Sequence, residues 1–226
     1  MKTITSLKRF FYLNALAIIT AVTVSSAPST LWAGESVDLL KGGLANWKMD
    51  KAGAWELKDG VLSPVAKIGG YIWSKDAYED FEIVLEYKTS KDCNSGLFFR
   101  TDPKNAVQGG FEIQIASSNM YHERNEGRNV LGSLYDALAP TEIAGKADGE
   151  WNTMKLTCKG PKITLVLNGK TVIEADIDQW DTANKNPDGS KNKFKKPLKD
   201  LPRKGHIGFQ FHGHPVWFRN VKLKTL

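Results

Sequence analysis

Short runs of alternating apolar and polar residues recur along the chain, and no long stretch has the spacing of an amphipathic helix. Each run is about four to eight residues of alternating, β-branched or aromatic character, bounded by Gly, Asp, Asn or Pro, as is typical of β-strands. The runs are "AWELKDGVLS", "GGYIWSK", "DFEIVLEYKTS", "SGLFFRTD", "GGFEIQIAS", "EWNTMKLTCKG", "KITLVLNGKTVIEAD", "GHIGFQF" and "VWFRNVKLK". Such a chain can bury its apolar residues only by packing strands face to face.

Two of the links between these runs are hairpin signals. Asp59-Gly60 and Asn168-Gly169 are dipeptides that accept a positive φ at both central positions of a tight turn. We therefore expect an all-β fold of about ten strands, a two-sheet antiparallel β-sandwich or jelly roll. The chain has 226 residues, a length that one such domain accounts for, and no internal repeat indicates a propeller or solenoid.

The N-terminal segment has the layout of a secretory signal peptide. Three basic residues precede an apolar run over residues 10–24, and small residues follow up to Ala33. We predict a signal peptide over residues 1–33, a mature domain over residues 34–226, and export to the periplasm or beyond. The alternative is an uncleaved anchor, but the run is interrupted by polar residues and is shorter than the ~20 residues that span a bilayer. No stable membrane anchor is expected.

The charge of the chain argues against nucleic acid as a partner. The full chain carries +6, and removing the leader, which has three basic and no acidic residues, leaves +3. Much of this excess lies in the basic run over residues 185–204. Because prolines and a glycine interrupt that run and Phe194 is its only aromatic residue, we interpret it as a solvated loop.

Cysteine and histidine usage does not indicate a metal site. Cys93 and Cys158 either pair in an oxidising compartment or remain buried free thiols, and both alternatives are open. They are too few for a disulfide scaffold or a Cys-rich metal site. Oxygen donors such as Asp102 and Asp136 would suit calcium, but no EF-hand loop and no helical histidine motif is present. We expect no cofactor and no metal.

Strand phase predicts a polar face. In "LFFR", "FEIQI" and "FQFH", alternate residues point to opposite sides of their sheet. The apolar set of each strand can then pack against the second sheet. The polar set points outward and is richer in hydrogen-bonding groups than an ordinary surface strand. It consists of Arg100, Glu112, Gln114, Gln210 and His212.

Six motifs together resemble the 3-keto-disaccharide hydrolase domain family, over nearly all of residues 34–226. They are "NSGLFFR" (94–100), "GGFEIQI" (109–115), "GSLYD" (132–136), "GEWN" (149–152), "LNG" (167–169) and "GHIGFQFHGHPVWFRNVKLK" (205–224). The resemblance implies a concanavalin-like lectin/glucanase sandwich, export, and cleavage of 3-keto-glycosides. Where many members of the family have aspartate, this chain has Phe211. By strand phase Phe211 points away from Gln210 and His212, so the exchange should affect packing more than chemistry.

The implied chemistry needs a base, a group that stabilises an oxyanion, and an acid. A ketone at C3 of a sugar acidifies the hydrogen on C2, so that a base can remove it and the group at C1 can leave; water then adds. We predict His212 as the base, because imidazole accepts protons near neutral pH. Arg100 with Gln114 or Gln210 would hold the oxyanion, and Glu112 or Tyr135 would protonate the leaving oxygen. Further predicted substrate contacts are Asp136, Asn94 and His214.

Two other functions remain open at this point. An ordinary glycosidase needs two carboxylates that face one glycosidic bond, and Glu112 and Asp136 are available, but the Glu-x-Asp-x-x-Glu strand of laminarin-type glucanases is absent. A non-catalytic carbohydrate-binding module would use tryptophan rings as platforms. We expect most tryptophans to be core residues instead, including Trp151 and Trp217, which lie within strand patterns.

Overall fold

The computed structural model describes residues 36–65, 68–117 and 124–226, which belong to the compact unit Gly34–Leu226. The predicted signal peptide lies outside the described residues, so cleavage and export stay predictions of the sequence. None of the described helices has the length and apolar character that crossing a membrane requires.

The described residues form strands joined by loops and short 3-10 helices. The strands are β1 (Val37–Asp38), β2 (Trp47–Met49), β3 (Trp55–Lys58), β4 (Val61–Pro64), β5 (Gly70–Tyr78), β6 (Phe81–Thr89), β7 (Asn94–Thr101), β8 (Phe111–Ala116), β9 (Asn152–Lys159), β10 (Lys162–Leu167), β11 (Lys170–Asp176), β12 (Gly205–Phe211) and β13 (Val216–Thr225). The 3-10 helices are η1 (Gly43–Asn46), η2 (Pro103–Asn105), η3 (Arg124–Gly127), η4 (Ile177–Gln179) and η5 (Leu198–Asp200).

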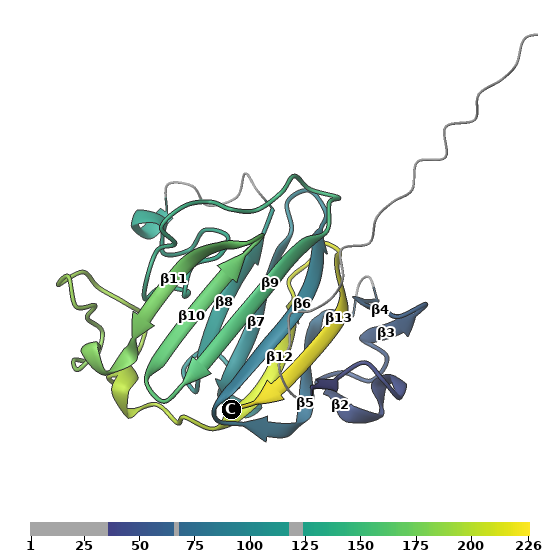
Figure 1. Cartoon of the computed structure of the whole chain (residues 1–226), viewed down its shortest axis with the longest axis horizontal. Helices are drawn as coiled ribbons and strands as arrows, with labels where there is room; N and C mark the ends of the chain where they lie inside the picture. Colours follow the sequence, from purple (N-terminus) through teal and green to yellow (C-terminus); the bar gives the residue numbers. More distant parts are fainter. Residues whose placement is uncertain (1–35, 66–67, 118–123) are drawn as a thin grey trace, which may run out of the picture. The chain divides into compact units, whose positions relative to one another are not determined.

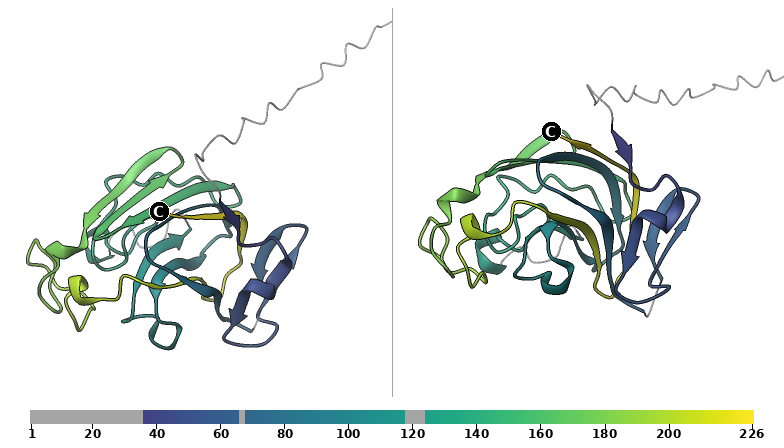
Figure 2. Two further views of the ribbon diagram at one scale, coloured as in Figure 1. Left: turned by 60° about the horizontal axis from the view of Figure 1, so that its bottom comes forward. Right: turned by 90° about the horizontal axis from the view of Figure 1, so that it is seen from below.

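Two sheets divide these strands between them. The eight-stranded sheet has the order β11-β10-β9-β6-β13-β4-β3, with β1 pairing to β13, and the five-stranded sheet has the order β2-β5-β12-β7-β8. All pairings are antiparallel, and Figure 1 shows β9, β10 and β6 in front of β7 and β8. The predicted all-β two-sheet sandwich is confirmed. Figure 2 shows the segment from β2 to β4 at one side of the sandwich and the loop between β11 and β12 at the opposite side.

Both predicted hairpin turns have the expected backbone. Asp59 and Gly60 have φ values of 51° and 76°, and Asn168 and Gly169 have 51° and 84°. Positive φ at both central residues is the requirement of a type I′ turn, whose twist matches that of the paired strands. The turns join β3 to β4 and β10 to β11.

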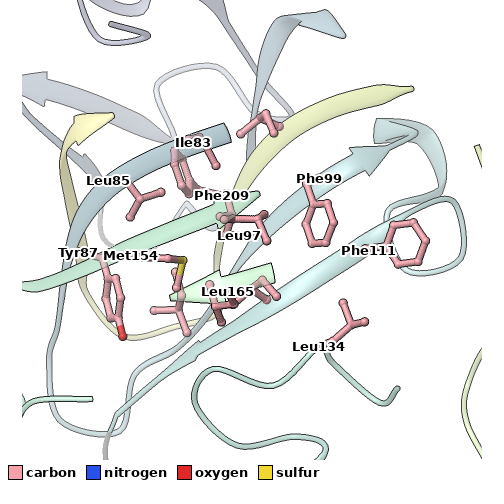
Figure 3. Packing of buried hydrophobic residues seen from close by; sticks show 14 of the residues in the cluster. Ile83, Leu85, Tyr87, Leu97, Phe99, Phe111, Leu134, Met154, Leu165 and Phe209 are labelled. Carbon is pink, nitrogen blue, oxygen red and sulfur yellow. The ribbon is translucent and has the colours of Figure 1, made fainter. Parts of the chain in front are cut away.

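The core lies between the sheets. Phe209 of β12 and Phe218 of β13 stack with ring centroids 4.1 Å apart, which joins the two layers directly. Figure 3 shows the same interleaving for Leu97 and Phe99 of the five-stranded sheet with residues of the eight-stranded sheet.

Both cysteines are buried in this core as free thiols. Burial raises the pKa of Cys93 and of Cys158 to about 12, so both keep their protons at neutral pH.

Two tryptophans are not where the sequence predicts them. Trp151 and Trp217 are half-buried on the outer side of the eight-stranded sheet, where the Lys88 ammonium lies 5.1 Å and 4.8 Å from their ring centroids. The core prediction for these two residues is wrong. In β13, Val216 and Phe218 are buried, and the strand alternation therefore directs Trp217 outward.

Arg100 is a structural residue and does not belong to a polar face. It is fully buried, and its guanidinium donates to the Glu79 carbonyl (2.8 Å), the Gly160 carbonyl (2.8 Å) and the Asp80 carboxylate (2.9 Å). Its φ of 49° breaks the alternation of β7 at this position, and this explains why strand phase placed it wrongly. The predicted oxyanion role of Arg100 is therefore wrong.

Replacing Arg100 by lysine should destabilise the fold. A lysine keeps the charge but lacks the planar fork that reaches three separate acceptors. We expect Arg100→Lys to lower the free energy of unfolding by about 3 kcal/mol, measured by urea denaturation. Arg219→Lys is the control, because its pair with Glu86 is on the surface and should contribute less than about 1 kcal/mol. Equal losses in the two variants would contradict the structural role.

Candidate active site

The side of the five-stranded sheet that faces away from the core carries a polar and aromatic surface. The register pairs Tyr71 with Gln210, Gly208 with Phe98, and Phe98 with Glu112. The alternate residues of the same strands lie in the core. We call this surface the outer face. It is made of Tyr71, Trp73, Asn94, Gly96, Phe98, Glu112, Gln114, Gly208 and Gln210.

A chain of hydrogen bonds crosses the outer face. Gln114 Nε2 donates to Asn94 Oδ1 (3.0 Å), and Asn94 Nδ2 lies 3.2 Å from Nδ1 of His212, the exposed residue that follows β12. Because the Asn94 oxygen already accepts from Gln114, the Asn94 amide nitrogen is the atom that faces His212. In this arrangement His212 accepts at Nδ1, and the neutral ring carries its proton on Nε2.

Gln114 has a further atom that needs a partner. Its Oε1 is buried and has no hydrogen-bond partner within residues 36–65, 68–117 and 124–226. Buried polar atoms are nearly always paired with protein or water. A buried water molecule beside Asn94 would satisfy this acceptor.

A second group on the outer face combines an aromatic cluster with a phenol. Tyr71 stacks on Trp73 with ring centroids 5.1 Å apart and meets the edge of Phe98 at 5.3 Å. The Tyr71 hydroxyl accepts from Gln210 Nε2 at 3.1 Å. Burial raises the pKa of Tyr71, so the phenol stays protonated and can donate its own hydrogen.

Two glycines make room for large side chains to lie flat across the sheet. A Cβ at Gly96 would lie 2.3 Å from Glu112 Oε1, and a Cβ at Gly208 would lie 2.2 Å from the Trp73 ring. The Glu112 carboxyl thus rests over the backbone of β7, and the Trp73 indole rests over β12. Any side chain at either glycine would displace them.

Glu112 is the most perturbed carboxyl of the site. It is 8% exposed, and one carboxyl oxygen lies 3.8 Å from the Lys193 ammonium. Burial raises the pKa of Glu112 to about 7, and Lys193 offsets only part of this effect. Burial also lowers the pKa of Lys193, which the Glu112 and Asp136 charges partly restore. A carboxyl with a pKa near neutrality can both accept and donate a proton.

Lys193 reaches the site because its loop packs against the sheet. The Lys193 ammonium lies 4.2 Å from the centroid of the Tyr135 ring, and its backbone N–H donates to the Asp136 carboxylate. The Tyr135 N–H donates in turn to the Glu112 carbonyl at 2.9 Å. Tyr135 and Asp136 therefore hold the lysine in place from the side of β8.

The loop itself is partly packed, which corrects the prediction of a solvated loop over residues 185–204. Asn186 and Phe194 are each 3% exposed, and Leu198 is 1% exposed. Asn186 Oδ1 accepts from the Trp180 indole and from the Asn192 amide, both at 2.9 Å. This buried amide network gives the basic segment a defined shape.

The structure brings most of the predicted site residues together. Asn94, Gln114 and His212 form one chain of hydrogen bonds, and Tyr135 and Asp136 contact Lys193 beside Glu112. His214 lies exposed in the turn between β12 and β13. Arg100 is buried and does not lie on the outer face.

Sequence reasoning missed Tyr71 and Lys193 as members of the site. The alternation in "GGYIWSK" was a usable signal for Tyr71. No signal pointed to Lys193, one of several lysines in its loop. Among the described residues, no group of three or more His, Cys, Asp or Glu side chains is placed to hold a metal ion.

Residues 35–224 match the family described as the 3-keto-alpha-glucoside-1,2-lyase-like domain. The chain belongs to this family. It is 26% identical over 203 residues to the 3-keto-disaccharide hydrolase of Bacteroides thetaiotaomicron, a match that covers 76% of this chain and 70% of that protein. The predicted relationship to the 3-keto-disaccharide hydrolases is thereby confirmed.

Solved structures agree with this assignment. The crystal structure of a candidate glycosyl hydrolase from Parabacteroides distasonis ATCC 8503 superposes with a TM-score of 0.80 at 36% identity, covering 85% of this chain and all (100%) of that one. A β-glucanase of Bacillus licheniformis superposes with a TM-score of 0.52 at 12% identity, covering 86% of this chain and 100% of that chain. The second likeness shows the concanavalin-like lectin/glucanase fold alone.

A methyl group at Gly96 should displace the Glu112 carboxyl. We expect Gly96→Ala to push it toward water and lower its pKa from about 7 toward the usual ~4.3, measured by carboxyl-carbon NMR titration. Overpacking of this kind should also cost about 1–3 kcal/mol of unfolding free energy. An unchanged titration midpoint would contradict the close packing of Glu112 over Gly96.

Proposed function

We propose that this member of the family cleaves the glycosidic bond of 3-keto-glycosides by removing the C2 proton, and that Glu112 is the base. The family match supports the substrate class. The observation that carries the proposal is the buried Glu112 carboxyl, whose pKa is raised to about 7 beside the Lys193 ammonium. A base whose pKa lies near the working pH is both sufficiently ionised and sufficiently basic to take a proton.

The proposal exchanges the roles of Glu112 and His212 predicted from the sequence. With Nδ1 accepting from Asn94, the neutral His212 ring presents an N–H at Nε2 and has no lone pair for a substrate proton on that side. It is suited instead to donate a hydrogen bond to a sugar oxygen. Glu112 has no such restriction, because its carboxyl needs only to ionise.

The negative charge that develops on the C3 oxygen needs a partner. The Lys193 ammonium is a cation in a partly dehydrated position, its side chain 22% exposed, where an electrostatic interaction is stronger than in water. The same cation lies next to Glu112, so base and oxyanion partner face one region. Lys193 thereby takes the role that strand phase had given to Arg100.

The remaining steps follow from the ketone. Loss of the C2 proton gives an enolate, whose electron pair forms a C1–C2 double bond as the C1–O bond breaks and the leaving oxygen takes up a proton. Tyr135 and the newly protonated Glu112 are the donors that we assign to this oxygen. Addition of water to C1, with return of a proton to C2, completes a net hydrolysis.

The arrangement favours this reaction over a two-carboxylate glycosidase. The Asp136 carboxylate is bonded to the Lys193 backbone N–H and supports the loop, so it does not stand opposite Glu112 as a free second carboxyl. A pure sugar-binding module is also disfavoured. The Trp73 ring is 2% exposed beneath Tyr71 and Phe98, and binding alone has no use for a carboxyl with a neutral pKa.

Replacing Glu112 tests the proposal. The purified protein is incubated with a 3-keto-disaccharide and separately with its unoxidised parent, and the products are followed by mass spectrometry. We expect cleavage of the keto sugar only, and a kcat about 10²–10⁴-fold lower for Glu112→Gln with sugar binding retained. Because the base must be ionised, wild-type kcat should rise as the pH passes through about 7.

Glu56→Gln is the matched control, because Glu56 is an exposed carboxyl on β3 outside the outer face. It should leave the turnover unchanged. Cleavage of the unoxidised parent alone, or full activity of Glu112→Gln, would overturn the proposal.

A further inference from the structure

A cavity of about 600 Å³ adjoins the outer face at Trp73. Its lining comes from β2, the middle of β5, the start of β12 and the η2 turn, and it consists of Lys48, Met49, Asp50, Trp73, Ser74, Lys75, Asp102, Pro103, Lys104 and His206. Its volume falls within the range of ordinary small-molecule sites. Another cavity of about 490 Å³, beside β10 and β11, contains none of the outer-face residues.

The cavity lies on the same row of the sheet as Glu112. Trp73 pairs with Gly208, Gly208 with Phe98, and Phe98 with Glu112. At the usual strand spacing the backbones at the two ends of this row are about 14 Å apart. This row of paired residues therefore connects Glu112 to the cavity across the five-stranded sheet.

The cavity lining has three lysines and two aspartates, an excess of one positive charge. Lys48, Lys75 and Lys104 are exposed, and none forms an ion pair within residues 36–65, 68–117 and 124–226. Its two carboxylates accept hydrogen bonds from uncharged N–H groups and form no ion pair with these lysines. Asp50 accepts from the Trp73 indole at 2.9 Å, and Asp102 accepts from the backbone N–H of Lys104 at 3.0 Å.

The floor and one wall of the cavity have fixed positions. The Trp73 indole is held by its hydrogen bond to Asp50 and by its stack on Tyr71. His206 Nδ1 lies 2.8 Å from the Ser74 carbonyl, to which it donates, so its Nε2 is the free nitrogen. Three exposed ammonium groups thus share the cavity lining with an imidazole and an indole edge whose positions are fixed by hydrogen bonds.

We propose that this cavity is the subsite for the leaving part of the substrate and that it selects a sugar with an anionic group, such as the carboxylate of a uronic acid. The inference rests on the proposed function for the placement of the keto ring, and it adds the chemistry of the ring beyond it. Unpaired lysines form charge-assisted hydrogen bonds with a carboxylate, which are roughly twice as strong as neutral ones.

The kinetic test uses two 3-keto-disaccharides that differ only in the leaving sugar, glucose in one and glucuronic acid in the other. We expect wild-type kcat/KM to be about tenfold higher for the anionic substrate. In the double variant Lys75→Gln/Lys104→Gln the preference should disappear, because kcat/KM for the anionic substrate falls to the value for the neutral one. Lys159→Gln, at an exposed position at the end of β9, is the control and should keep the preference.

A binding test separates this inference from the proposed function. Methyl β-D-glucuronide and methyl β-D-glucoside are titrated into the wild-type protein and the double variant and followed by NMR. Stronger binding of the glucuronide, lost in the double variant, supports the subsite even if neither keto sugar is cleaved; in that case only the proposed function fails. Equal binding of both sugars, or a preference that survives the two substitutions, overturns the subsite.

Discussion

The burial of the Glu112 carboxyl is the constraint on which the site depends. A carboxylate is rarely taken out of water without a partner, because the charged form loses its hydration. Here the side chain lies over Gly96 and under the Lys193 loop, and the result is a pKa near 7 in place of one near 4. The Lys193 ammonium, 3.8 Å away, lowers the pKa of Glu112 by less than burial raises it. At neutral pH the carboxyl is therefore present in both its protonated and its ionised form.

The eight-stranded sheet serves the core, and the five-stranded sheet carries both core residues and the outer face. The eight-stranded sheet and the inward faces of β7, β8 and β12 build the core, where Phe209 and Phe218 join the layers. That packing fixes the register of the five-stranded sheet, and the register in turn fixes which residues lie beside one another on the outer face. The loop between β11 and β12 then supplies the cation beside Glu112, because Asn186 and its amide partners give that loop a defined shape.

The predictions from sequence succeeded where strand alternation governs the geometry. The fold class, both hairpin turns, and the shared face of Glu112, Gln114 and Gln210 follow from a period of two and from turn chemistry. Alternation failed for Arg100, whose positive φ turns its side chain away from that face. For Trp217 the alternation was correct but was not applied. Val216 and Phe218 point into the core, so the Trp217 ring must point outward. Lys193 could not be predicted from the sequence, because its position depends on how a distant loop packs and not on any local pattern.

The most direct test of the account is the fate of hydrogen at C2. A 3-keto-disaccharide carrying deuterium at C2 is cleaved by the wild-type protein, and the product is analysed by mass spectrometry early in the reaction, before the free keto sugar can exchange. Proton abstraction by Glu112 predicts slower cleavage of the labelled substrate and a product that has lost the deuterium to solvent. A product that keeps the deuterium would contradict abstraction at C2, and direct displacement at C1 would then replace it.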